Sequence, residues 1–315
     1  MKKKFLALAV ALCLILSGCN AATDTGSKDN GKVCVVSTIY VGYDLAKTIG
    51  GENAEVKLLL KPGSESHTFE PTPKDIIAIE SGSIFICTGG ENDAWVETIL
   101  SGVDNKDLQI IRMTDCVPSL YEEEIVEGME EEEEGEEEET EWDEHVWMDA
   151  DNAVAIACAI RDAFVKADSA HEAQYSDNAQ SFCDALYEVD KEIKAVVAGA
   201  ARREVIFADR FPARYFTERY GLSYYAAFPG CSENTEASAA TVSFLIDKTK
   251  EDNIPAVFTI ELSAGKLGTA VSEETGAKIL TFYTGHNVSA DDFEKGISFI
   301  DMMKMNCEVL KEALN

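Results

Sequence analysis

Short runs of apolar residues alternate with longer segments of helical pattern along most of the chain. In the first half these runs, rich in Val and Ile, cover residues 33–39, 56–60, 84–87 and 108–113. The second half repeats them at residues 205–208, 222–228, 256–260 and 278–282. Strands that are apolar at every position are buried on both faces, as in parallel sheets. The pattern therefore predicts an α/β fold of two lobes with mainly parallel sheets.

A long helix is predicted between the two sets of strands. Residues 168–200 contain no Pro, and their only Gly is Gly199. Apolar side chains recur there at steps of three or four, at Tyr175, Phe182, Leu186, Val189, Ile193 and Val197. Such spacing is typical of one helix, here ~50 Å long if continuous. We expect it to be a rigid connection.

This helix divides the mature chain. We expect an N-terminal lobe over residues 32–167, a linking helix over 168–200 and a C-terminal lobe over 201–315. The second lobe closes with an amphipathic helix predicted over about residues 289–314. The length suffices for two domains of ordinary size, and we expect them to share no single core.

The N-terminus has the pattern of an export signal. Three lysines precede an apolar run at residues 5–16, which is too short to span a bilayer permanently. The next residues, Ser17, Gly18 and Cys19, resemble the end of a bacterial lipobox. We predict a signal peptide over residues 1–18, lipidation of Cys19 and a polar tether over 19–31. An ordinary secretory signal with a chance cysteine is the alternative.

The formal net charge of −31 argues against nucleic acid and anionic lipid headgroups as partners. About half of it comes from the acidic segment, residues 122–144, which has fifteen Glu, one Asp and no basic residue. Like charges at this density repel, so we predict a disordered surface loop over residues 121–144 in the first lobe. The loop either only solvates the surface or collects cations weakly near a binding cleft.

Three of the four histidines follow predicted strands or adjoin predicted helix starts. His67 follows a Pro-Gly turn, His145 follows the acidic segment, and His286 follows the last predicted strand. Parallel α/β folds bind ligands at this edge of the sheet. Helix-start signals adjoin the first two, namely Thr72, Pro73, Asp75 and Asp149. His171 lies near the exposed start of the linking helix, and we assign it no role.

Two long motifs resemble those of the solute-binding lipoproteins of bacterial ABC importers for zinc and manganese. The first, a Pro-Gly turn, a His and then Glu-Pro-Thr-Pro-x-Asp, matches residues 62–75. The second matches residues 143–153, with Glu144 and Ala150 in place of two prolines. The resemblance covers nearly the whole mature chain. Zinc members often carry a His-rich loop where this chain has its acidic segment.

The resemblance implies one metal ion between the lobes, with His67 and His145 as ligands from the first. The second lobe departs from the family pattern. Zinc members usually have a His, and manganese members a Glu, near the position of Asp209. The usual last ligand is Asp or Glu, whereas this chain has His286. We therefore expect His67, His145, His286 and Asp209 to bind the metal.

Asp209 has a second interpretation, an ion pair or helix cap beside Arg210. In that case Cys231 or Glu236 would be substitute ligands. Seven cysteines follow Cys19, an odd number, and none forms a CxxC pair. A complete set of disulfides is therefore impossible, and the common structural zinc and redox motifs are absent.

Three nitrogen donors and one oxygen favour Zn(II), with Mn(II) as the second choice. We expect a monomeric, extracytoplasmic zinc-capturing subunit of an ABC importer, anchored to the cell membrane by its lipid. Its partners, a membrane permease and a cytoplasmic ATPase, are implied by the resemblance alone. A manganese-binding subunit, a zinc enzyme and a metal-binding adhesin are the alternatives. No HExxH, GxSxG or Walker-type motif occurs, so we expect no enzyme.

Overall fold

The computed structural model describes residues 31–64, 69–90, 93–129, 142–232 and 236–315. Residues 32–315 form one compact unit. The predicted signal peptide, Cys19 and all but the last residue of the tether lie outside the described residues. Within the described ranges, no helix has the length and apolar character needed to cross a membrane.

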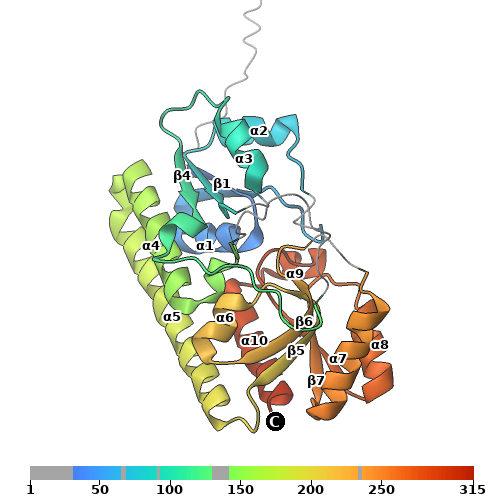
Figure 1. Ribbon diagram of the computed structural model, residues 1–315. Helices are drawn as coiled ribbons and strands as arrows, with labels where there is room; N and C mark the ends of the chain where they lie inside the picture. Colours follow the sequence, from blue (N-terminus) through green and yellow to red (C-terminus); the bar gives the residue numbers. More distant parts are fainter. Residues whose placement is uncertain (1–30, 65–68, 91–92, 130–141, 233–235) are drawn as a thin grey trace, which may run out of the picture. The chain divides into compact units, whose positions relative to one another are not determined.

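Two parallel sheets of four strands form the centres of the two lobes (Figure 1). The first has the order β2-β1-β3-β4, with β2 Ala54–Leu58, β1 Val33–Ser37, β3 Ile84–Cys87 and β4 Gln109–Arg112. The second has the order β6-β5-β7-β8, with β6 Ser223–Pro229, β5 Glu204–Phe211, β7 Ala256–Ile260 and β8 Lys278–Phe282. Each strand overlaps a predicted apolar run, which confirms the predicted α/β fold.

Helices cover both faces of each sheet. The first lobe has α1 Tyr40–Gly50, α2 Pro73–Glu80, α3 Ala94–Leu100 and α4 Ala150–Ala167. The second has α6 Arg214–Tyr220, α7 Ala239–Glu251, α8 Lys266–Thr275, α9 Ala290–Lys295 and α10 Phe299–Ala313. Strand β3 is buried at every position, and its residues alternate between two core clusters. Burial on both faces explains why its sequence is apolar throughout.

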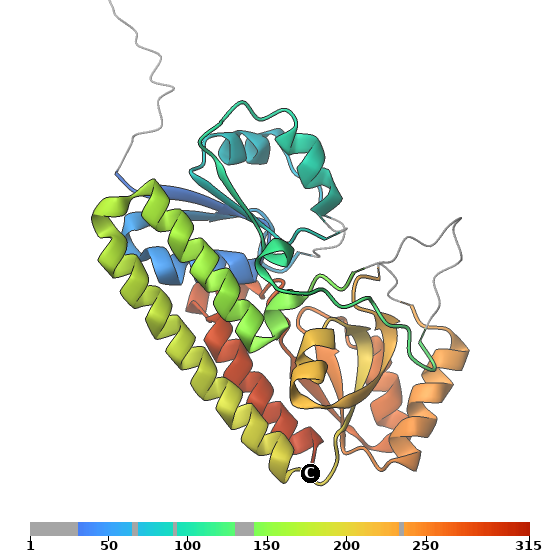
Figure 2. The ribbon, with the colours of Figure 1, turned by 60° about the vertical axis from the view of Figure 1, so that its left-hand side comes forward.

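The linking helix α5, Glu172–Gly199, runs along both lobes, with α4 and α10 packed beside it (Figure 2). Its 28 residues span about 42 Å at about 1.5 Å per residue. One contiguous core cluster contains Val35 of the first sheet, Leu186 of α5 and Phe282 of the second sheet. The expectation of two lobes without a shared core is therefore wrong. The apolar face of α5 is long enough to pack against the cores of both lobes at once.

The predicted C-terminal helix over residues 289–314 is two helices, α9 and α10. Gly296 ends α9 in the left-handed region, with a φ of 71°. Ser298 then begins α10, because its hydroxyl accepts a hydrogen bond from the backbone N–H of Asp301 and the Asp301 carboxylate accepts one from Ser298. A glycine stop followed by a capping box separates the helices. The apolar periodicity alone did not reveal this break.

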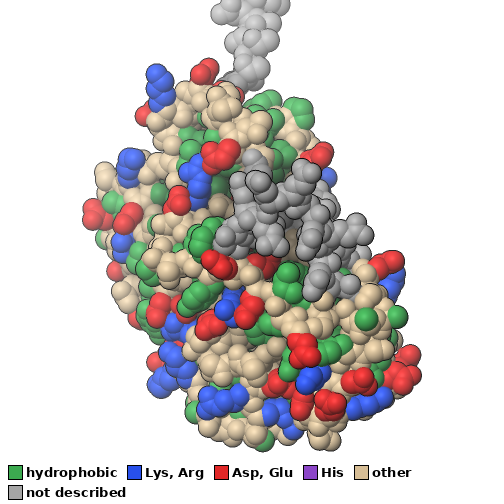
Figure 3. Space-filling model, in the orientation of Figure 1, with side chains coloured by type: hydrophobic (Ala, Val, Ile, Leu, Met, Phe, Trp, Pro, Cys, Tyr) green, Lys and Arg blue, Asp and Glu red, His purple; other side chains and the backbone are tan. Residues whose placement is uncertain are grey.

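The two ends of the acidic segment depart from the predicted disorder. Glu122 pairs with Trp142 in an antiparallel bridge. Glu124 forms an ion pair with Arg214 on α6. A backbone bridge and an ion pair therefore hold the ends of the segment in place. Residues 130–141 lie outside the described residues. On the face shown in Figure 3, acidic and basic side chains of the described residues are interspersed over the second lobe.

Candidate metal centre

His145 is fully buried at the entrance to α4. Asp149 is the N-cap of this helix, and its side chain accepts hydrogen bonds from two backbone N–H groups, as the sequence predicted. His145 Nδ1 lies 2.9 Å from Asp143 Oδ1, which also accepts the backbone N–H of His145 at 2.8 Å. An ionised carboxylate can only accept, so Nδ1 carries the proton. Nε2 is then the nitrogen able to bind a metal, and it has no hydrogen-bond partner among the described residues.

His286 lies after β8 and is only 7% exposed. Its Nδ1 is 3.4 Å from Thr284 Oγ1. The Thr284 hydroxyl donates its proton to Glu261 Oε1 at 2.6 Å, so its oxygen is left to accept from Nδ1–H. This relay favours the same tautomer as in His145, with Nε2 as the nitrogen that binds a metal.

Glu261 fixes the loop that carries His286. Besides the Thr284 hydroxyl, it accepts the backbone N–H groups of Thr284 at 2.8 Å and Gly285 at 3.0 Å. Burial raises the pKa of Glu261 to about 7, while these hydrogen bonds act in the opposite direction. From the first lobe, Trp147 Nε1 donates to the carbonyl of Thr284 at 2.7 Å. Sequence reasoning missed Glu261, although an acid directly after an apolar strand is a usable signal.

The structure brings His145 and His286 together from the two lobes. Their ring centroids lie 4.6 Å apart, edge to face at 84°. Trp147 packs against both rings, with centroid separations of 5.5 and 5.1 Å. Backbone bonds add a further connection, since Tyr40 N–H donates to the carbonyl of His286 at 2.8 Å. The predicted juxtaposition of strand-end histidines therefore holds for this pair.

Buried carboxylates surround His145. Asp143 is 1% exposed and Glu144 2% exposed. Burial lowers the pKa of His145, but the charge and hydrogen bond of Asp143, with the charges of Glu144 and Glu123, outweigh it and raise the pKa overall. The same negative charge favours any cation at this position. Sequence reasoning assigned no role to Glu123.

A small pocket opens beside His286. Its lining consists of Thr38, Ile39, Leu60, Phe69, Thr88, Asp93, Trp95, Glu144 and His286. His67 lies outside the described residues, and Leu60 and Phe69 lie on either side of it in the sequence. In the described part of the chain, His, Cys, Asp and Glu side chains form no group of three or more that could hold a metal ion. His67 as a ligand stays a prediction.

The remaining predicted ligands have different surroundings. Asp209 Oδ1 accepts the backbone N–H of Arg210 at 2.9 Å, and no hydrogen bond joins Asp209 to either imidazole among the described residues. Burial raises the pKa of Asp209, against hydrogen bonds from Ser263 and Arg210. Glu236 is exposed ahead of α7. Cys231 is partly buried and its backbone N–H donates to Glu123 Oε1 at 2.9 Å. Asp209 as a ligand stays a prediction.

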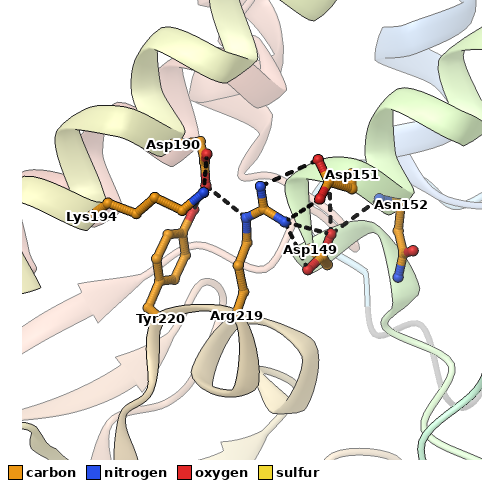
Figure 4. A network of polar contacts seen from close by, with 7 residues as sticks. All are labelled: Asp149, Asp151, Asn152, Asp190, Lys194, Arg219 and Tyr220. Atoms are coloured by element: carbon orange, nitrogen blue, oxygen red, sulfur yellow. Dashed lines mark hydrogen bonds and ion pairs between the residues drawn. The ribbon is translucent and has the colours of Figure 1, made fainter.

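An ion-pair network fixes α4, which follows His145, to the linking helix and the second lobe (Figure 4). Arg219 of α6 donates to Asp190 of α5 at 2.6 Å and, at the start of α4, to the N-cap Asp149 at 3.1 Å and to Asp151 at 2.9 Å. Tyr220 also donates to Asp190, at 3.0 Å. Only 9% of the Arg219 side chain is exposed. The segment that presents His145 is thus anchored to both neighbouring elements.

Two α/β lobes completed by one long helix, with a histidine from each lobe buried where they meet, define a two-lobed metal-binding protein. Residues 35–313 match the ZnuA family, described as zinc-uptake complex component A, periplasmic. The chain belongs to this family, which confirms the resemblance expected from its motifs. Members of this family are components of a zinc-uptake complex.

Named relatives cover the whole chain. It is 29% identical over 323 residues to the high-affinity zinc uptake system protein ZnuA of Bacillus subtilis, covering 100% of this chain and 99% of that protein. It is 27% identical over 313 residues to the zinc-binding lipoprotein AdcA of Streptococcus pneumoniae. That match covers 99% of this chain but only 61% of AdcA.

Solved structures share the fold. The Zn(II)-bound ZnuA-like domain of Streptococcus pneumoniae AdcA gives a TM-score of 0.73 at 25% identity, covering 90% of this chain and 99% of that one. The metal-dependent lipoprotein YcdH from Bacillus subtilis gives 0.75 at 27% identity, covering 90% and 100%. A laminin-binding adhesin from Streptococcus agalactiae gives 0.75 at 20% identity, covering 89% and 99%, a likeness in fold alone.

Proposed function

We propose that this chain captures Zn(II) outside the cytoplasm and delivers it to the permease of an ABC importer. The observation that carries this proposal is the buried pair His145 and His286, contributed by opposite lobes. Both rings have an acceptor at Nδ1, which favours a metal-binding Nε2 on each. The names of the ZnuA and AdcA relatives, a zinc uptake protein and a zinc-binding lipoprotein, support zinc as the cargo.

The proposed ligands are His145 and His286, together with His67 from its motif and a fourth group from the second lobe, for which Asp209 is the prediction made from sequence. Imidazole donors suit zinc, whereas Mn(II) prefers more oxygen ligands and higher coordination numbers. A site filled by protein ligands has no open position for substrate, which supports transport rather than catalysis.

We further propose that the mature chain is a monomer anchored to the membrane by lipid on Cys19. Its partners are then a membrane permease and a cytoplasmic ATPase. Support for the anchor comes from the lipobox-like residues ahead of Cys19 and from relatives named as lipoproteins. Support for the partners comes from the family, a component of a zinc-uptake complex.

Metal analysis by mass spectrometry tests the zinc site. The purified parent and three variants, His145→Ala, His286→Ala and His171→Ala, are loaded with zinc and freed of excess. His171 is the matched control because it is exposed and pairs with Asp168 at 2.6 Å. We expect the parent and the His171 variant to retain zinc and the other two to lose it. Retention by both of those variants would refute the proposed site.

A further inference from the structure

The neighbouring helices α4 and α5 run antiparallel, and two contacts fix their register (Figure 2). At one end, the rings of Phe164 on α4 and Tyr175 on α5 pack with their centroids 5.0 Å apart. Toward the other end, Arg219 donates both to Asp151 on α4 and to Asp190 on α5. These contacts determine which residues of the two helices lie at the same level.

Two cysteines, Cys158 of α4 and Cys183 of α5, lie between these contacts. Cys158 is seven residues from Asp151, and Cys183 is likewise seven residues from Asp190. Because seven residues make nearly two turns, each cysteine lies on the same face of its helix as that aspartate. From the aromatic contact the separations are six and eight residues, so the levels of the two cysteines agree within about 3 Å.

The packing of the helices puts the two thiols within reach of each other. Helix axes about 8–10 Å apart, with each Cα about 2.3 Å from its axis, bring facing Cα atoms within the roughly 7 Å that a disulfide can span. The Cys183 thiol has a hydrogen bond with that of Cys158, which agrees with this register. Both cysteines are free in this structure.

The surroundings of the two thiols differ, which gives them different roles in oxidation. Arg161, one turn along α4, places its Nη1 3.9 Å from Cys158 Sγ, so positive charge lies beside a sulfur that reacts as a thiolate. Cys158 is half-buried, and an oxidant can reach it from solvent. Burial raises the pKa of the Cys183 thiol to about 11, while Arg161 acts in the opposite direction. Cys158 is therefore the thiol that reacts first.

We propose that Cys158 and Cys183 form a disulfide that joins α4 to the linking helix. The oxidant is a small disulfide, and protein disulfides persist outside the cytoplasm. The Cys158 thiolate attacks one sulfur of the oxidant and releases one thiol. The Cys183 thiolate then attacks the Cys158 sulfur and releases the second. The chain loses two electrons and two protons, which the oxidant gains as its S–S bond becomes two thiols.

This disulfide would stabilise the helix that follows the His145 segment. It closes a loop over residues 158–183, which removes conformational freedom from the unfolded chain. The helix α4 would then be held to α5 by a covalent bond as well as by the Arg219 network. The inference goes beyond zinc capture and does not depend on it.

Peptide mapping by mass spectrometry tests the disulfide. The folded mature chain is incubated with glutathione disulfide, its remaining thiols are blocked with N-ethylmaleimide, and it is digested without reduction. We expect one pair of linked peptides, joined through Cys158 and Cys183. Cys158→Ser should abolish the link and leave Cys183 blocked by the reagent. The matched control Cys116→Ser alters another half-buried cysteine and should keep the link.

Urea denaturation supplies a second measurement. The oxidised parent should unfold at a higher urea concentration than the reduced parent, and Cys158→Ser should show no such shift. A folded parent that carries glutathione on Cys158 without any link to Cys183 overturns the proposal. So does a parent in which other cysteines are linked as often as this pair, or one whose linked form unfolds at the same urea concentration as the reduced form. Each of these results leaves the zinc-binding function standing, because metal analysis tests that function separately.

Discussion

Two clusters of buried polar side chains join the lobes, and they differ in how far their polar atoms are satisfied internally. In the Arg219 network, every guanidinium nitrogen donates to a carboxylate. In the histidine cluster, His145 Nε2 has no hydrogen-bond partner among the described residues, although buried carboxylates lie close by. A saturated network stabilises one arrangement, whereas an unsaturated one keeps a place for a ligand. Substitutions in the Arg219 network should therefore lower the free energy of unfolding. Substitutions in the histidine cluster should lower zinc affinity.

The largest effect is expected from Arg219→Ala. The substitution leaves Asp190 buried without its main partner, so the free energy of unfolding should fall by about 3–5 kcal/mol. Urea denaturation of the zinc-free chain measures this. Lys194→Ala is the control, because Lys194 bonds the same carboxylate but its side chain is 53% exposed, so its loss should cost about 0–1 kcal/mol. Equal losses in the two variants would contradict the assignment of Arg219 as the centre of the network.

The second prediction separates the clusters by their response to zinc. Free zinc at about 100 times its dissociation constant should add about 2.7 kcal/mol to the free energy of unfolding of the parent. Arg219→Ala should start lower and keep most of that increment. His286→Ala should lose most of it at the same zinc concentration. The comparison fails if zinc stabilises His286→Ala as much as the parent.

The third prediction concerns the relay behind His286. Thr284→Val removes the hydroxyl that links Nδ1 to Glu261, so the ring loses its orienting acceptor. Zinc affinity should fall by about tenfold, the lower limit for outer-shell partners. Thr281→Val, on the exposed part of β8, is the matched control and should bind like the parent. An unchanged affinity in Thr284→Val would mean that the relay does not prepare His286 for metal.

The smallest effect is a shift in pH dependence. A ligand imidazole must be neutral, so protons compete with zinc and affinity falls as pH decreases, by at most about tenfold per pH unit for each ring. The pKa of His145 is raised by Asp143, so this fall should begin above the usual histidine value. Asp143→Asn should move it to lower pH. Competition titrations between about pH 8 and pH 5.5 measure the shift, and identical profiles would contradict this role of Asp143.

Most of the fold could be predicted from local pattern. Buried parallel strands are apolar at nearly every position, so the run 84–87 coincides with β3. The helix caps could also be predicted, since Thr72 and Asp75 form the predicted capping box at the start of α2. The shared core was not predictable, because it depends on where Leu186 and its neighbours on α5 pack. Apolar periodicity gives the face of a helix but not its partner.

The site residues could be predicted only where they follow a strand or precede a helix, because the topology of the sheet then determines where they lie. Histidines that follow strands or precede helices meet at one edge, which brought His145 and His286 together. The charged groups around them come from distant parts of the sequence. Glu123 contacts Cys231 across 108 positions, and no motif marks that pairing. Glu261 is marked in the sequence as an acid directly after an apolar strand, but its hydrogen bonds to the loop that carries His286 are visible only in the fold.

Anomalous X-ray diffraction from crystals of the zinc-loaded chain tests the central claim most directly. We predict one zinc peak within bonding distance, about 2.0–2.1 Å, of both His145 Nε2 and His286 Nε2. The Arg219 network should be unchanged beside it. A zinc peak that contacts neither imidazole, while both rings keep the arrangement described above, would contradict the account.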